Sequence, residues 1–296
     1  MKIVKILQIL LLTAVLSAFI SLEKGYAQEI CEWWNYKNIT VGGKAVKVKD
    51  MANASHDELR ATAANDAQPQ LIERLIGIRI TAGNIVNKEQ ATAVAALGKT
   101  IEEKFDAKGN IKIEFGVPVY GEDSLAKIVF KKESIRPLIK PSKEQKKVEG
   151  DYTSLVIDCA KWEDSNKKYL NPVMIPELKD DAGKVVYGYG HIDYDTAVNN
   201  GYAQYAMDLT HQDIGNKPLI IQAVGIADEL GNPIISAKDT DRILSENLVA
   251  HFLENASVII ISRSVKSNIN TRGTKTWGNR DSSGYSGGAK ITGAKG

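Results

Sequence analysis

The sequence predicts an α+β protein in which two small domains of mixed helices and sheets follow a signal peptide and precede a disordered basic tail. Apolar residues alternate with polar ones along several short segments, as in half-buried strands, and recur every three or four residues along others, as in amphipathic helices. Hydrophobic residues make up 43% of the 296 residues and charged residues 25%, which is ordinary for folded domains and excludes a wholly disordered chain. Strand-like and helix-like segments do not alternate strictly, which favours α+β over a βαβ series.

Residues 1–27 have the pattern of a secretory signal peptide. Two lysines near the N-terminus precede an apolar stretch at 6–20, and Gly25 and Ala27 supply small residues just before the expected cleavage point. The apolar stretch is shorter than the roughly 20 residues that span a bilayer. We therefore expect cleavage after Ala27, no transmembrane segment after processing, and a periplasmic or extracellular location.

Residues 28–130 form the first predicted domain, which opens with strands. These strands are expected over 33–48, with Gly42-Gly43 as the turn between them. A pair of glycines suits a turn because glycine adopts backbone conformations that are strained for other residues.

A helix is expected to follow these strands. Asn53 or Ser55 can cap its start, and Gly77 marks its end. Pro69 lies inside this helix and lacks a backbone donor, so we expect the helix to bend or split near Ala67.

The rest of the first domain mixes helices and a strand. We expect a helix at 88–104, a turn at 106–109, a strand at 111–119 and a short helix at 124–129. The strand is the best supported of these elements, because apolar and charged residues alternate along its first half.

Residues 131–150 predict a linker, since they are charged, contain two prolines and end in glycine. Residues 151–262 then form the second predicted domain. Its strands are expected at 152–158, 185–187, 202–206, 219–224 and 257–261, with an irregular stretch at 161–183.

The last helix of the second domain begins at Ser236, which has Asp239 at the spacing of a capping box. Leu244, Leu248 and Phe252 recur at helical spacing, and we expect them to form the apolar stripe that packs on the domain.

Residues 263–296 predict a disordered basic tail. From 262 to 296 the chain carries seven Lys or Arg residues against one Asp, whereas residues 28–261 carry a net charge of −6. The tail has few large apolar residues and cannot bury enough surface to offset the entropy of ordering. Its charge suits contact with an anionic polymer, and the alternative is a solvated terminus without a role.

The two cysteines leave two interpretations open. Cys31 and Cys159 can form a disulfide in an oxidising compartment, or Cys159 can be a small buried hydrophobic residue while Cys31 stays unpaired. We do not expect Cys31 to be lipidated, because a charged and a bulky residue precede it.

Chemistry-bearing residues are sparse. We expect no catalytic, cofactor-binding or metal-binding residues. His191, Asp193 and Asp195 alternate, as metal ligands on one face of a strand would, but the same residues also suit an exposed polar loop. The alternative is an enzyme of unrecognised type that uses the loops at 158–195. Asp158, His191 and Asp193 are its candidate residues, and their convergence in one pocket would favour it.

A contact loop is the main functional candidate. Tyr187 and Tyr189 lie among turns next to His191, and aromatic side chains on loops are frequent anchors of binding surfaces. We therefore expect Tyr187, Tyr189 and His191 to form an exposed contact loop.

Two groups of segments resemble a known family. The first group comprises an alanine-rich helix that ends in a Leu–Gly turn, and a strand that ends in Val-Pro-Val-Tyr-Gly, at residues 61–67, 71–80, 109–121 and 124–126. This group is similar to the twenty-kilodalton envelope lipoprotein family and to the related N-terminal domain of flagellar assembly protein T. The second group, at residues 152–158, 170–176, 180–188 and 217–223, resembles the companion region of longer envelope proteins. This chain departs from the pattern because it lacks a lipobox and places Pro69 within the helix.

The resemblance implies a non-enzymatic envelope role, with an association with the flagellum as a further implication. Together with the signal peptide, it predicts an exported protein that contacts an envelope protein or a cell-wall polymer. We expect no cofactor and no nucleic-acid partner, and the sequence does not indicate the oligomeric state.

Overall fold

The computed structural model describes residues 32–35, 37–45, 54–143 and 147–265 of the chain. The described residues contain both helices and sheets, so the α+β fold class is confirmed. The predicted signal peptide, Cys31 and the predicted tail beyond residue 265 lie outside the described residues. No described helix is long and apolar enough to cross a membrane.

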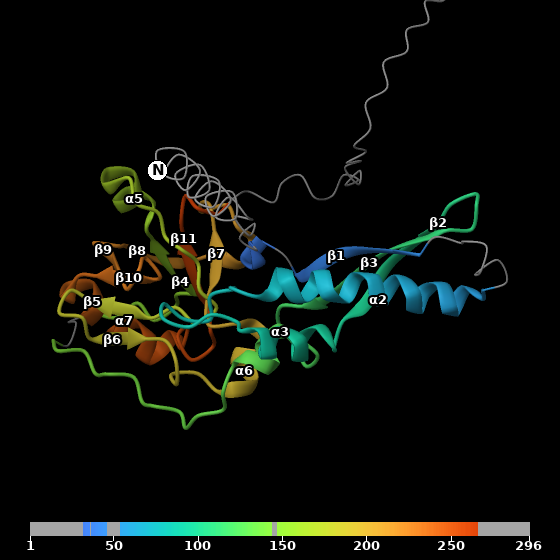
Figure 1. Cartoon of the computed structure of the whole chain (residues 1–296). Helices are drawn as coiled ribbons and strands as arrows, with labels where there is room; N and C mark the ends of the chain where they lie inside the picture. The colour runs from blue at the N-terminus through green and yellow to red at the C-terminus, as the bar shows by residue number, and fades with distance from the viewer. Residues whose placement is uncertain (1–31, 36, 46–53, 144–146, 266–296) are drawn as a thin grey trace, which may run out of the picture. The chain divides into compact units, whose positions relative to one another are not determined.

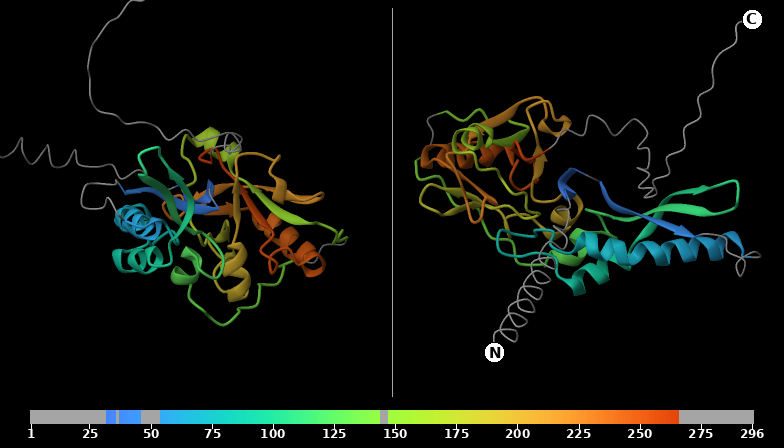
Figure 2. Two further views of the ribbon diagram at one scale, coloured as in Figure 1. Left: turned by 90° about the vertical axis from the view of Figure 1, so that its right-hand side faces the viewer. Right: turned by 45° about the horizontal axis from the view of Figure 1, so that its top comes forward.

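The first half of the chain forms a three-stranded antiparallel sheet in the order β1-β3-β2 (Figure 1). The helices α2 and α3 lie on one side of this sheet (Figure 2). The elements are η1 (Trp33–Asn35), β1 (Asn38–Ala45), α2 (His56–Leu75), α3 (Lys88–Ala95), β2 (Lys99–Phe105), β3 (Ile111–Pro118) and α4 (Leu125–Val129).

The expected turn at Gly42-Gly43 is wrong, because β1 runs straight through both glycines and pairs with β3 along its whole length. A Cβ atom at Gly43 would lie 2.2 Å from the carbonyl oxygen of Ala63 in α2. Glycine is therefore needed here for the close approach of the helix to the strand, and not for a change of chain direction.

The helix α2 begins and ends near the expected residues. Ser55 caps it in a reciprocal pair with Glu58, and its buried residues recur every four positions from Leu59 to Leu75. The helix is not split near Ala67, as we had allowed, since α2 continues through Pro69 without interruption. The packing of its buried face on the sheet holds the helix together despite the missing donor.

The expected long helix at 88–104 is also wrong in its second half. The helix α3 ends at Ala95, Gly98 follows it, and β2 then pairs with β3 across a turn at Asp106–Gly109. Every residue of β2 is exposed. Its sequence therefore lacks the alternation of apolar and polar residues that predicts a half-buried strand.

The second half of the chain contains two four-stranded sheets. One is wholly parallel, in the order β7-β11-β4-β8, and the other is mixed, in the order β6-β5-β10-β9. The strands are β4 (Ser154–Asp158), β5 (Leu178–Asp180), β6 (Val185–Tyr187), β7 (Gln204–Ala206), β8 (Pro218–Gln222), β9 (Gly225–Ala227), β10 (Asn232–Ile235) and β11 (Val258–Ile261). The helices are α5 (Ala160–Asn166), α6 (Tyr194–Asn200), η3 (Gln212–Ile214) and α7 (Ala237–Ala250). We expected residues 161–183 to be irregular, but they contain most of α5 and the strand β5.

The apolar stripe expected on α7 is wrong at one position. Leu244 is buried, but Leu248 is 67% exposed. The helix ends at Ala250 with His251 in a left-handed conformation, so Phe252 lies beyond the helix and enters the core from the following turn.

The buried residues on both sides of 131–150 belong to one continuous hydrophobic core. A backbone hydrogen bond from Gly121 to Val198, 2.9 Å long, is one of the contacts between these two parts of the chain. The core of the second half lies on one face of the parallel sheet, and a smaller cluster around Val156 and Ile259 lies on the other.

Candidate functional site

A cleft of about 770 Å³ opens where the loop after α2 faces the mixed sheet. This volume falls within the usual range for small-molecule sites. The cleft is lined by residues 80–85, Asn87 and Gln90 on one side, by Val129, Lys131, Glu133 and Tyr189 on a second, and by Ile175, Glu177, Lys179, Asp228, Glu229 and Asn232 on a third.

The loop after α2 forms the first wall and is held by its own backbone. The N–H groups of Ile80 and Thr81 donate to the carbonyl oxygen of Asn84, at 2.8 and 3.2 Å. The Nδ2 atom of Asn84 donates to Thr81 Oγ1 at 3.1 Å. The loop is therefore a closed turn with a defined shape.

The start of α3 continues this wall through a reciprocal cap. Asn87 Oδ1 accepts the N–H of Gln90 at 2.9 Å, and Gln90 Oε1 accepts the N–H of Asn87 at 3.1 Å. The cap uses the oxygen of each side-chain amide and fixes both side chains. Their NH2 groups have no acceptor among the residues that the structure describes.

The mixed sheet supplies the opposite wall, which is organised around Asp228. Lys179 Nζ lies 2.5 Å from Asp228 Oδ2 and 3.4 Å from Glu177 Oε2, and Asn232 Nδ2 donates to Asp228 at 3.0 Å. The hydrogen bonds from Asn232 and Lys179 hold the pKa of Asp228 below its usual range. Asp228 therefore stays ionised at neutral pH and keeps Lys179 in place.

The turn between β9 and β10 has an unusual backbone. Asp228, Glu229 and Leu230 all have positive φ angles, of 49°, 53° and 68°, although none of them is glycine. Gly231 closes the turn by donating to the carbonyl oxygens of Ala227 and Asp228, both at 3.1 Å. Left-handed conformations of ordinary residues are costly and concentrate at functional sites. Here they place two carboxylates on the rim of the cleft.

The remaining wall joins Tyr189 to the segment after α4. Tyr189 Oη donates to the carbonyl oxygen of Lys131 at 3.1 Å, and Arg136 N–H donates to the carbonyl oxygen of Gly190 at 2.6 Å. Partial burial raises the pKa of Tyr189, so its hydroxyl stays protonated at neutral pH. These bonds hold the ring at the edge of the cleft.

The residues of the expected contact loop separate in the structure. Tyr189 lines the cleft, whereas Tyr187, which we expected to be exposed, is 1% exposed and donates to the carbonyl oxygen of Tyr202 at 2.7 Å. Tyr187 and Tyr189 lie two residues apart, but Tyr187 ends a strand that faces the core. His191 is half-buried against Tyr187, with Nδ1 3.2 Å from Gly188 O.

The three candidates of the enzyme hypothesis are each engaged with separate local partners. Asp158 accepts from the side chain of Gln222 at 2.9 Å, and Asp193 caps α6. His191 contacts its own turn, and burial lowers its pKa. No hydrogen bond or ion pair joins Asp158, His191 and Asp193, all of which lie within the described part of the chain.

Of the two cysteines, only Cys159 lies in the described part of the chain. Its side chain is fully buried at the end of β4, and burial raises the pKa of its thiol. Cys31 lies outside the described residues, so the disulfide between them stays a prediction.

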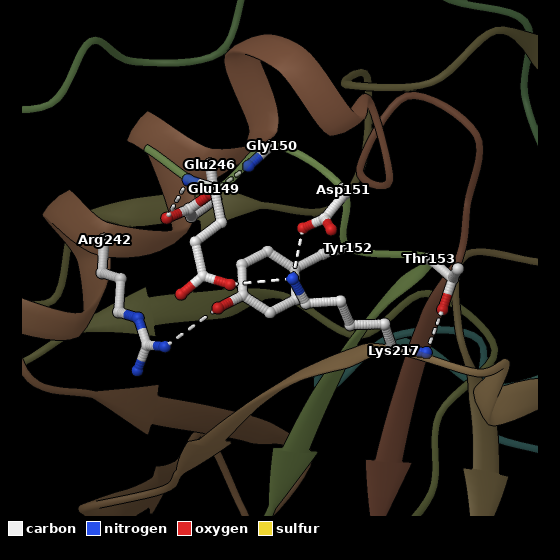
Figure 3. Close-up of polar contacts among 8 residues, drawn as sticks. All are labelled: Glu149, Gly150, Asp151, Tyr152, Thr153, Lys217, Arg242 and Glu246. Carbon is white, nitrogen blue, oxygen red and sulfur yellow. Dashed lines mark hydrogen bonds and ion pairs between the residues drawn. The ribbon is translucent and has the colours of Figure 1, made fainter. Parts of the chain in front are cut away.

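A second polar network lies where 149–153 meets β8 and α7 (Figure 3). Lys217 Nζ lies 2.8 Å from Glu149 Oε2 and 2.5 Å from Asp151 Oδ1. The buried carboxylate of Glu246 accepts the backbone N–H groups of Glu149 and Gly150, at 3.0 and 2.8 Å. The last residues of the predicted linker are thus anchored to the second half of the chain. The side chains of this network contact one another and the backbone, and none of them lines the cleft, so we interpret the network as structural.

Sequence reasoning missed most of the cleft. Residues 80–90 and 228–232 come from opposite halves of the chain, and only the fold brings them together. Asn87 and Gln90 do have the spacing of a capping box, which is a signal of a helix start and not of a binding site.

Residues 154–264 are similar to the family described as the second domain of Treponema pallidum Tp0624. The match begins with β4 and ends just after β11, so it covers the parallel and mixed sheets. No curated protein shows significant similarity to the chain. The resemblance to envelope lipoproteins and to flagellar assembly protein T stays a prediction.

Proposed function

We propose that this chain is an exported, non-enzymatic protein of the cell envelope that binds an envelope protein or a cell-wall polymer in the cleft. The observation that carries this proposal is the cleft itself, whose three walls hold polar side chains in fixed positions. Fixed groups lose little freedom when a ligand binds, which favours affinity.

Export rests on the sequence pattern of residues 1–27. The proposal requires a mature chain that begins at Gln28, and mass spectrometry of the exported protein measures this directly. A chain that retains Met1 in the membrane fraction would contradict export.

A binding role is favoured over catalysis by the state of the candidate catalytic groups. Asp158, His191 and Asp193 each have local partners, and none of them lines the cleft. General acid–base chemistry needs such groups within hydrogen-bond reach of the substrate. The enzyme hypothesis therefore has less support.

Tyr189 gives a sharp test of the binding role. The mature protein is incubated with isolated cell envelopes, the envelopes are sedimented, and the bound protein is quantified. We expect Tyr189→Ala to reduce retention strongly. Tyr169→Ala is the matched control, because Tyr169 is 48% exposed and lies outside the cleft. Equal retention of both variants would contradict the proposal, as would absence of retention for the unaltered protein.

A further inference from the structure

The charges of the cleft are already balanced by the protein. Each of the four lining carboxylates has a cationic partner: Lys179 for Glu177 and Asp228, Arg136 for Glu133, and Arg79 for Glu229. Lys131 also lines the cleft, so that four carboxylates and four cations lie in or beside it and its net charge is close to zero. The electrostatics therefore favour a neutral ligand.

The side-chain amides of the cleft offer donors and an acceptor. The NH2 groups of Asn87 and Gln90 have no acceptor in the described part of the chain, since only their oxygens are used in the cap. Asn84 has the opposite arrangement, because its Nδ2 donates to Thr81 while its Oδ1 has no donor within the described residues. A ligand that both accepts and donates hydrogen bonds would satisfy all three amides.

The cleft also presents apolar surface beside its polar groups. Ile85 is 56% exposed at its edge, and Tyr189 contributes a half-buried aromatic ring. Aromatic rings with a polar end favour ligands that have an apolar face and polar edges. A pyranose ring has this character, since its C–H groups form faces and its hydroxyl groups form the rim.

From these features we infer that the cleft binds a short neutral glycan that carries acetamido groups, as an extension of the proposed envelope-binding function. The acetamido carbonyl accepts from the NH2 groups of Asn87 and Gln90, and the acetamido N–H donates to Asn84 Oδ1. The ring faces pack on Tyr189 and Ile85. The volume of about 770 Å³ accommodates two or three sugar units.

The structure offers variants that remove the donors and preserve the fold. Asn87→Asp and Gln90→Glu keep the oxygens of the cap, and aspartate is as good a helix cap as asparagine. Each change replaces an NH2 donor by an acceptor. The matched control is the double variant Asn199→Asp with Gln212→Glu, since both residues are exposed, lie outside the cleft and give the same change in charge.

The probe is triacetylchitotriose, an acetamido-bearing trisaccharide, titrated into the mature protein by calorimetry. Maltotriose is the control ligand, because it has the ring size and the hydroxyl groups without acetamido groups. We expect binding of triacetylchitotriose alone. Asn87→Asp with Gln90→Glu should weaken it roughly tenfold or more, and the matched control should not. Thermal melting of each variant verifies that the fold is intact.

Three results would overturn the glycan assignment: no binding of triacetylchitotriose, equal binding of maltotriose, or equal weakening in the matched control. If the protein still sediments with envelopes through Tyr189 in any of these cases, the proposed function stands and only the ligand class is wrong. If a wall peptide binds in place of the glycan, the proposed function likewise stands and only the ligand class is wrong. Failure of the envelope experiment as well would remove both proposals.

Discussion

Gly43 and Ala63 meet backbone to backbone, so closely that a Cβ atom at Gly43 would lie 2.2 Å from the carbonyl oxygen of Ala63. The same Cβ atom would lie 2.8 Å from the Cβ of Ala67. The helix α2 therefore rests directly on β1, and the small residues of both elements set the distance between them.

Replacing Gly43 by alanine should push α2 away from β1. Overpacking of a tight contact typically costs about 1–3 kcal/mol, and the obstacle here is a backbone atom that cannot rotate away. We expect Gly43→Ala to lower the free energy of unfolding in urea by about 2 kcal/mol or more. Gly83→Ala is the control, because no atom lies within 4 Å of its Cβ position, and it should change stability by less than about 0.5 kcal/mol. Equal effects would refute the packing argument.

The buried carboxylate of Glu163 joins α5 to the end of β11. It accepts from Leu170 N–H at 2.7 Å, from Ser262 Oγ at 2.6 Å and from Arg263 N–H at 2.7 Å. Glu163→Ala leaves these donors unsatisfied in the interior, so we expect a loss of about 3 kcal/mol or more in the free energy of unfolding. Asp164→Ala, next to it but exposed, should cost less than about 1 kcal/mol. Similar losses for both variants would show that Glu163 does not have this role.

The network around Lys217 predicts a specific pH dependence. Hydrogen bonds from Lys217 hold the pKa values of Glu149 and Asp151 below their usual range. Groups with lowered pKa values stabilise the fold above the pKa of the unfolded chain, near pH 4, and lose this contribution as the pH falls through the folded value.

Lys217→Met should therefore lower the thermal midpoint at pH 7, and its effect should shrink as the pH falls below 4 towards 2.5 and the two carboxyls take up protons. At each pH, the difference in thermal midpoint between Lys217→Met and the unaltered protein measures how much Lys217 stabilises the fold. A gap that stays constant between pH 7 and pH 2.5 would mean that Lys217 acts through its contact with the Tyr152 ring and not through the two carboxylates.

Cys159 should be inert in the folded protein. It is fully buried and its thiol pKa is raised, whereas alkylation requires an accessible thiolate. We expect iodoacetamide at pH 8 to leave Cys159 unmodified until denaturant is added, as measured by peptide mass spectrometry. Labelling of the denatured, unreduced chain then decides between the two interpretations: no labelled cysteine indicates a disulfide between Cys31 and Cys159, and two labelled cysteines indicate that they are unpaired. Modification of Cys159 in the native protein would contradict its burial.

The elements that could be predicted from the sequence are those with a local signal. Ser55, one of the two expected caps, marks the start of α2, and the alternation of apolar residues from Ile111 onward marks β3. The same logic found the short helix that begins after Ser124. In each case the residues that determine the element are neighbours in the chain.

The elements that were missed depend on distant partners. The strand β2 is wholly exposed and exists because β3 pairs with it, and β1 passes through two glycines because α2 lies against them. The four strands of the parallel sheet were each expected from the sequence, but their pairing was not, because the partners lie far apart in the chain.

The cleft shows the same limit. Tyr189 was identified because aromatic residues in turns are visible in the sequence, but the adjacent Tyr187 has the same appearance and is buried. Asn87, Gln90 and Asp228 could not be connected with Tyr189, because the positions that bring them together are set by the packing of the two halves. A binding site that is built from several loops has no continuous sequence signature.

The measurement that tests the cleft most directly is amide hydrogen exchange, followed by mass spectrometry, on the mature protein with and without solubilised cell-wall and envelope fragments. We expect slower exchange in the peptides that contain residues 79–90, 129–133 and 228–232, because these segments form the walls of the cleft. Peptides from the exposed strand β2 and from α5 serve as internal references and should exchange at unchanged rates. Protection confined to those reference segments, or no protection anywhere, would contradict the assignment of the cleft as the binding site.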